Sequence, residues 1–138
     1  MKYNCTVISV SDINAARKFY EDLFGLEVFQ DYGINIAFTC GLALQQNFDW
    51  LVNIPQEQVL KKSNNMEICF EKQDFDLFLD KLKKYPDIEY CGEIVEHSWG
   101  QRVIRFYDLE PGRAERKWRA GNGTCGVCGS ALPSDDGF

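Results

Sequence analysis

The sequence predicts an α+β protein built from two β-α-β-β-β modules whose strands form a cupped mixed sheet. Two helical segments share the same capping residue and the same apolar stripe, and segments with alternating apolar residues lie on both sides of each helix. The first half of the chain also superposes on the second half at a constant offset, which indicates an internal repeat. We expect the last strand of the second module to be atypical or missing.

The two predicted helices begin and end with recognisable signals. Residues 13–24 carry apolar side chains at helical spacing, with Asp12 at the N-cap position and Gly25 at the C-terminal stop. The second helix follows the matching cap Asp74 and ends before Pro86, because proline cannot continue a helix. In the repeat Asp12 falls on Asp74, so caps and apolar stripes match together.

Strand-like segments complete each module. They cover residues 5–10, 26–30, 34–39 and 42–46 in the first half, and residues 67–71, 88–96 and 102–107 in the second. One face of each first strand is expected to pack under its helix, because side chains alternate between the faces of a strand. The opposite faces carry Cys5, Val7, Ser9, Glu67, Cys69 and Glu71. Carboxylates on such a face indicate a wet cavity or a metal site.

The repeat divides the chain into a first module (1–47), a polar linker (48–65), an incomplete second module (66–110) and an atypical Gly- and Arg-rich tail (111–138). After Pro111 isoleucine and tyrosine vanish, glycine becomes frequent, and no alternating apolar run replaces the expected eighth strand. The simplest hypothesis is that the tail is an altered reading frame or an unrelated fused end rather than the natural end of such a module. The coding DNA would distinguish these origins.

Composition limits the partners. The 138 residues are 45% hydrophobic and 14% aromatic, enough for a core and against global disorder. A formal net charge of −6 argues against nucleic acid and anionic membrane surfaces, which are bound by clustered Lys and Arg. The N-terminus lacks a signal peptide, and no apolar run approaches the ~20 residues of a spanning helix. We therefore expect a cytoplasmic protein.

Six cysteines occur in the chain, and we expect them to be reduced. Four lie in or next to strand-like segments, where cysteine behaves as a small hydrophobe. The other two, Cys125 and Cys128, have the spacing of half a zinc site or of a redox motif. No second pair lies nearby and glycines surround the motif, which favours an incidental pair in the tail.

Two segments resemble the vicinal-oxygen-chelate superfamily of glyoxalases, bleomycin resistance proteins and extradiol dioxygenases. The stretch from Val10-Ser11-Asp12 through Phe19-Tyr20-Glu21 to Leu23-Phe24-Gly25 looks like its opening signature. The stretch from His97 to Arg102 and on to Phe106-Tyr107-Asp108 looks like its penultimate strand. The resemblance covers residues 1–108. It implies a cup that holds a small-molecule ligand, and a homodimer in which the two modules pair within or between chains.

The resemblance also implies a divalent metal ion, such as Zn, Ni, Mn or Fe, held by His, Gln or Glu of the first and last strands. Carried over by position, the ligands would be Cys5, Gln45 (or Leu44 with a register slip), Glu67, and Glu115 or Arg116. Glu67 is a competent oxygen ligand, whereas an arginine would repel a metal. This set is poor for a glyoxalase-type site, and a metal-free cup is favoured.

Other residues are candidates for chemistry or ligand contact. Glu71 could transfer a proton beside a metal-bound Glu67, and His97, the only histidine, is either an acid–base group at the rim or a solvated turn residue. Trp99 with Arg102 and Arg105 would suit a planar or anionic ligand, or would form a structural hairpin with paired arginines. Val7, Ser9 and Cys69 are the expected lining of the cup.

Three functional hypotheses remain open. The first is a binding module that holds or senses a small molecule without chemistry, as bleomycin resistance relatives do. The second is a metal-dependent lyase, isomerase or dioxygenase acting on a small oxygenated substrate through Gln45, Glu67 and Glu115. The third is a chain that lost its function with its tail. Bound metal separates the first two, while the identity of the ligand cannot be read from the sequence.

Overall fold

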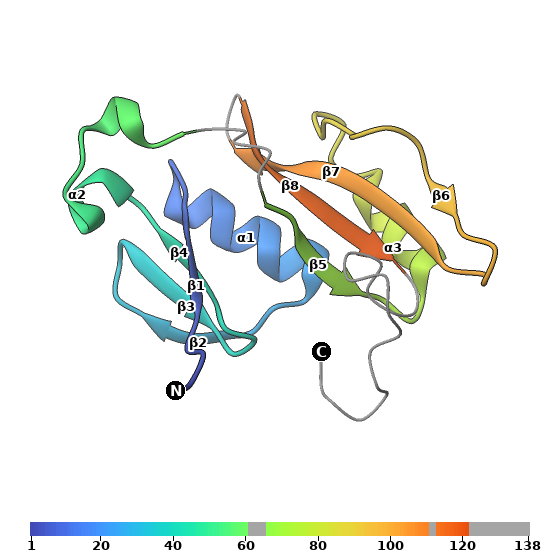
Figure 1. Cartoon of the computed structure of the whole chain (residues 1–138), viewed down its shortest axis with the longest axis horizontal. Coiled ribbons are helices and arrows are strands. Elements are labelled where there is room, and N and C mark those ends of the chain that lie inside the picture. Colours follow the sequence, from blue (N-terminus) through green and yellow to red (C-terminus); the bar gives the residue numbers. More distant parts are fainter. Residues whose placement is uncertain (61–65, 111–112, 122–138) are drawn as a thin grey trace. The chain divides into compact units, whose positions relative to one another are not determined.

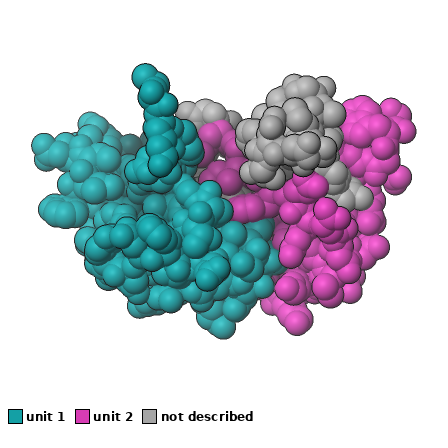
Figure 2. Space-filling view, turned by 90° about the horizontal axis from the view of Figure 1, so that it is seen from below, with its two compact units in different colours: residues 1–61, 109–115 teal, residues 62–108, 116–138 magenta. Residues whose placement is uncertain are grey.

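A computed structural model gives the fold. It describes residues 1–60, 66–110 and 113–121, and from residue 109 onward it describes the backbone alone. The chain divides into two compact units, Met1–Lys61 with Leu109–Glu115 and Lys62–Asp108 with Arg116–Phe138, which are coloured separately in Figure 2. Each unit is described by itself. Within the described ranges, no helix has both the length and the apolar character to cross a membrane.

The first module has its helix α1 beside a sheet of four strands, as can be followed in Figure 1. In chain order they are β1 (Thr6–Ser9), α1 (Ile13–Phe24), β2 (Val28–Asp31), β3 (Asn35–Phe38) and β4 (Leu42–Gln45). The strand order in the sheet is β1-β4-β3-β2, with β1 and β4 parallel and the other neighbours antiparallel. The predicted β-α-β-β-β module is therefore confirmed here.

The second module repeats this arrangement. Its elements are β5 (Ile68–Glu71), α3 (Phe75–Leu82), β6 (Val95–Glu96), β7 (Arg102–Glu110) and β8 (Arg113–Gly121). The strand order is β5-β8-β7-β6, and the first and last strands are again parallel neighbours. The internal repeat seen in the sequence is thus a repeat of topology.

The last strand of the second module was expected to be atypical or missing, and the structure excludes its absence. Residues assigned to the tail form β8, which pairs with β5 from Ile68 opposite Trp118 to Glu71 opposite Gly121. This pairing uses backbone N–H and C=O groups, so it does not require the alternating side chains whose absence suggested a missing strand. The described part of the tail therefore belongs to the fold, whereas Cys125 and Cys128 lie outside the described residues.

The predicted strand over residues 88–96 is much shorter in the structure. Only Val95 and Glu96 form β6, and Tyr90 makes an isolated bridge to Phe106. Gly92 lies between them with a φ of 81°, a left-handed conformation that interrupts an extended strand. The segment predicted as a linker is also partly ordered, as α2 (Phe48–Val52) and a 3-10 turn (Gln56–Gln58).

Each helix packs its apolar stripe on one face of its own sheet. The buried side chains of α1 are Ile13, Ala16, Phe19, Tyr20, Leu23 and Phe24. Tyr20 contacts Phe38 of β3 with ring centroids 6.1 Å apart, and Phe78 of α3 contacts Phe106 of β7 at 6.3 Å. These contacts identify the helix-covered faces of the two sheets and, by alternation, the opposite faces.

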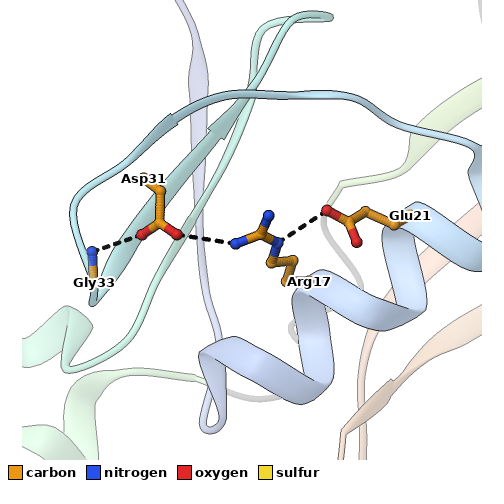
Figure 3. A network of polar contacts seen from close by, with 4 residues as sticks. All are labelled: Arg17, Glu21, Asp31 and Gly33. Atoms are coloured by element: carbon orange, nitrogen blue, oxygen red, sulfur yellow. Dashed lines mark hydrogen bonds and ion pairs between the residues drawn. The ribbon is translucent and has the colours of Figure 1, made fainter.

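A charged cluster ties the edge strand β2 to α1 (Figure 3). Arg17 of α1 makes ion pairs at 2.9 Å with Glu21, one turn further along the helix, and with Asp31 at the end of β2. Asp31 also accepts a hydrogen bond from the Gly33 N–H at 2.8 Å, which supports the turn into β3. The hydrogen bond to Glu21, together with the Asp31 carboxylate, raises the pKa of Arg17, so the guanidinium stays charged at neutral pH.

We expect Asp12→Ala to lower the free energy of unfolding by about 1 kcal/mol. Asp12 Oδ1 accepts hydrogen bonds from the Asn14 and Ala15 N–H groups at 3.0 Å, which alanine would leave without this partner. Chemical denaturation measures the change. Asp12→Asn keeps the accepting oxygen and serves as the control, and equal losses in both variants would contradict the capping role.

Candidate functional site

The candidate site in the first unit is the face of its sheet opposite α1. The register pairs Ser9 with Gln45, Gln45 with Asn35, and Val7 with Ala43, while Ile8 and Ile36 lie on the buried helix side. The opposite face is therefore formed by Val7, Ser9, Asn35, Ala37, Ala43 and Gln45. Most side chains on this face are small and surround one polar pair, and the central residues of the face, Ala43 and Gln45, are 3% and 2% exposed.

That polar pair consists of Gln45 and Asn35. The Gln46 carbonyl can only accept a hydrogen bond, so the Gln45 atom 2.7 Å from it must be the donor Nε2. Oε1 of Gln45 then faces Asn35, whose Nδ2 donates to it at 2.8 Å. Gln45 is 2% exposed. Each amide keeps one N–H that takes no hydrogen-bond partner from the described residues.

Asn35 and Gln46 were not predicted as functional residues. Asn35 begins β3, and the turn before it is closed by the hydrogen bond from the Tyr32 N–H to the Asn35 carbonyl at 2.8 Å. Gln46 Oε1 accepts from the Ile13 N–H at 3.0 Å, which joins the end of β4 to the start of α1. Only cross-strand register reveals that Asn35 orients Gln45, because ten residues of sequence separate the two.

The candidate site in the second unit is the face of its sheet opposite α3, and it carries an ion pair. Arg105 lies between Ile104 and Phe106 of β7, and Phe106 contacts α3, so Arg105 lies on the opposite face. Its Nε donates to Glu67 Oε2 at 3.0 Å. The Glu67 side chain is 13% exposed and that of Arg105 30%. Cys69 Sγ lies 3.8 Å from the other Glu67 oxygen.

Arg102, predicted to act with Arg105, lies on the helix side instead. Its guanidinium pairs with Asp76 in the first turn of α3 at 2.9 Å and lies 4.8 Å from the centre of the Phe75 ring. Three residues separate Arg102 from Arg105, an odd number of positions in a strand, so the two side chains lie on opposite faces. The structure therefore gives Arg102 a structural contact and leaves Arg105 on the candidate site.

The remaining predicted residues lie at the ends of strands. His97 and Trp99 stack on each other, with ring centroids 4.5 Å apart, in the hairpin between β6 and β7, and Trp99 is exposed. The Trp99 indole N–H donates to Gln101 at 3.3 Å. Glu71 is exposed and lies four residues beyond Glu67, which is about 13 Å along an extended strand. These residues do not cluster with the Glu67–Arg105 pair.

The positions that the superfamily uses for metal do not fit a divalent ion in this chain. Gln45 is the register partner of Ser9, so exposed Cys5 lies four positions, about 13 Å, further back along the strands. Zinc ligands lie about 2 Å from the ion, too close for such a spacing. Among the described residues, no three His, Cys, Asp or Glu side chains gather in a way that could hold a metal.

Strand register also changes which residue of the second module is the equivalent of Gln45. Gln45 pairs with Ser9, whose repeat equivalent is Glu71, and Glu71 pairs with Gly121. Gly121 rather than Glu115 is thus the repeat equivalent of Gln45, and glycine has no side chain to bind a metal. Glu115 lies six positions earlier in β8, and its side chain is outside the described part of the structure.

The topology of the two modules is that of the vicinal-oxygen-chelate class, whose members pair β-α-β-β-β modules. The sequence matches the glyoxalase-like domain family over residues 3–115, and the chain belongs to this family. The prediction of superfamily membership is therefore confirmed. No curated protein matches the sequence.

Solved structures with the same fold span nearly the whole chain. A protein of unknown function from Agrobacterium tumefaciens is 27% identical, with a TM-score of 0.71 over 89% of this chain and 94% of that one. The fosfomycin resistance protein FosX from Listeria monocytogenes is 16% identical, with a TM-score of 0.64 over 90% and 94%. A lactoylglutathione lyase from Agrobacterium tumefaciens is 23% identical, with a TM-score of 0.56 over 88% and 93%.

We expect Gln45→Glu to lower the free energy of unfolding by about 1–3 kcal/mol at neutral pH. A carboxylate cannot donate to the Gln46 carbonyl, and its charge would be buried. A protonated carboxyl can donate, so part of the loss should be recovered near the pH of about 4 at which glutamate protonates. Denaturation at both pH values measures this.

Gln46→Glu is the matched control, because it keeps an acceptor for the Ile13 N–H and places negative charge at the start of α1. It should be neutral or stabilising. Equal losses in the two variants at neutral pH would contradict the assigned orientation of Gln45.

A double-mutant cycle of Glu67→Gln and Arg105→Met should give a coupling free energy of about 1–3 kcal/mol, because the pair is hydrogen-bonded and largely shielded from water. The same cycle on Asp76 and Arg102 is the control. Asp76 is 77% exposed, so that coupling should stay below about 1 kcal/mol. A coupling at Glu67–Arg105 no larger than the control would show that the pair does not organise this face.

Proposed function

We propose that this protein binds a small molecule on a sheet face opposite a helix, without a divalent metal ion at the superfamily's ligand positions. Each module offers its own polar group for recognition: the Asn35–Gln45 amides on the sheet of the first module, and the Glu67–Arg105 pair on the sheet of the second. Both are polar groups held in place by protein hydrogen bonds, and ligand sites use a few such fixed groups for orientation and specificity.

The observation that carries this proposal is the ion pair at Glu67. This residue is the strongest metal-ligand candidate in the sequence, and its carboxylate is bound by the guanidinium of Arg105 at 3.0 Å. Arginine keeps its positive charge at all physiological pH values. A divalent ion would have to approach this charge and replace it as the partner of Glu67, which makes metal binding here unfavourable.

The fold neighbours support binding of a small molecule. Two of them are fosfomycin resistance proteins, from Listeria monocytogenes and Mesorhizobium loti, and another is a lactoylglutathione lyase. Their sequence identities of 16%, 16% and 23% establish a shared fold only. We infer from the fold that the ligand of this chain is likewise small.

We expect the protein to retain well under one equivalent of metal per chain after exposure to nickel, zinc, manganese or ferrous iron and removal of free ions. Mass spectrometry of the metals measures this in the wild type, in Glu67→Ala and in Glu71→Ala, which removes an exposed carboxylate from the same strand face. Zinc held by Cys125 and Cys128 would persist in both variants.

Near one equivalent in the wild type, lost in Glu67→Ala and kept in Glu71→Ala, would contradict the proposal. It would favour a metal-dependent lyase, isomerase or dioxygenase. The homodimer that the resemblance implies stays a prediction, which the molar mass in solution would test.

A further inference from the structure

We infer that Arg105 recognises an oxyanion of the ligand, such as a carboxylate, phosphonate or phosphate group, through the two terminal nitrogens of its guanidinium. Glu67 acts as the positioning residue that holds the opposite side of the guanidinium. This inference rests on the proposed small-molecule binding and names the chemical class of its ligand.

The first argument is the unused hydrogen-bonding edge of Arg105. A guanidinium carries five N–H donors in a planar fork. Glu67 takes only the Nε donor. Within the described part of the chain, Nη1 and Nη2 of Arg105 have no hydrogen-bond partner. The edge formed by these two nitrogens is the one that matches the two oxygens of a carboxylate or phosphonate group.

The second argument is the position of the pair. Arg105 lies on the face opposite α3 and is 30% exposed, so solvent and ligand can reach it. Glu67 is 13% exposed and restrains the guanidinium before any ligand arrives. Restraint of this kind lowers the entropy lost on binding, and partial burial strengthens a charge-assisted hydrogen bond. An oxyanion of the ligand on the opposite edge would place the Arg105 guanidinium between two negative groups, the Glu67 carboxylate and the ligand. The two would share its delocalised positive charge.

The third argument is the contrast with Arg102, three residues earlier in the same strand. Its guanidinium is already bound to Asp76 and lies over the Phe75 ring on the helix side. The two arginines are almost equally exposed, at 31% and 30%. Exposure therefore does not distinguish the two arginines, whereas their partners do. Of the two, only Arg105 lies on the face opposite α3 with a terminal edge that no described residue occupies.

The test is a titration of the full-length protein with methylphosphonate and with inorganic phosphate, followed by NMR of the arginine Nε–Hε signals. We expect saturable shifts of the Arg105 signal, assigned by its loss in Arg105→Met. Affinity should fall about tenfold or more in Arg105→Lys, which keeps the charge but lacks the planar fork. Arg102→Met, the matched control, should bind both probes like the wild type.

Circular dichroism checks that each variant is folded. If Arg105→Met does not fold, the comparison uses Arg105→Lys. No saturable shift with either probe, or equal affinity in the wild type and Arg105→Lys, would overturn the inference. Neutral small molecules that raise the melting temperature of the wild type and Arg105→Met alike, with no response to the oxyanions, would reject anion recognition and leave small-molecule binding in place.

Discussion

Parallel pairing of the first strand with the last organises both halves of this protein. β1 pairs with β4, and β5 with β8, so each module closes its sheet by joining segments that lie far apart in the chain. The helix between the first two strands then covers one face, and the same pairing defines the opposite face. Register along these parallel pairs decides which side chains lie next to each other on that face.

Register also decides which of the candidate metal ligands lie near one another within each sheet. It separates Cys5 from Gln45 and places Gly121 at the repeat equivalent of Gln45. Glu67 is instead bound by an arginine two strands away in its sheet.

Much of the fold was predictable from local signals. The caps Asp12 and Asp74 accept backbone hydrogen bonds at the starts of the two helices, and Gly25 ends α1 in a left-handed conformation, as their residue types indicate. The side-chain pattern did not reveal β8, because that strand pairs with β5 through its backbone. The pattern also predicted a long strand over 88–96, which the left-handed Gly92 interrupts. The sequence also singled out Glu67, because a carboxylate on a sheet face is costly to bury without a partner.

The sequence by itself determined the helices, the repeat and the superfamily, because caps, apolar periodicity and a short signature depend on residues close together in the chain. Only the tertiary structure decided that Arg105 rather than Arg102 accompanies Glu67, and that Asn35 orients Gln45. These contacts join residues ten to thirty-eight positions apart. They depend on strand order and on which face each side chain occupies, and neither is set by the neighbouring residues.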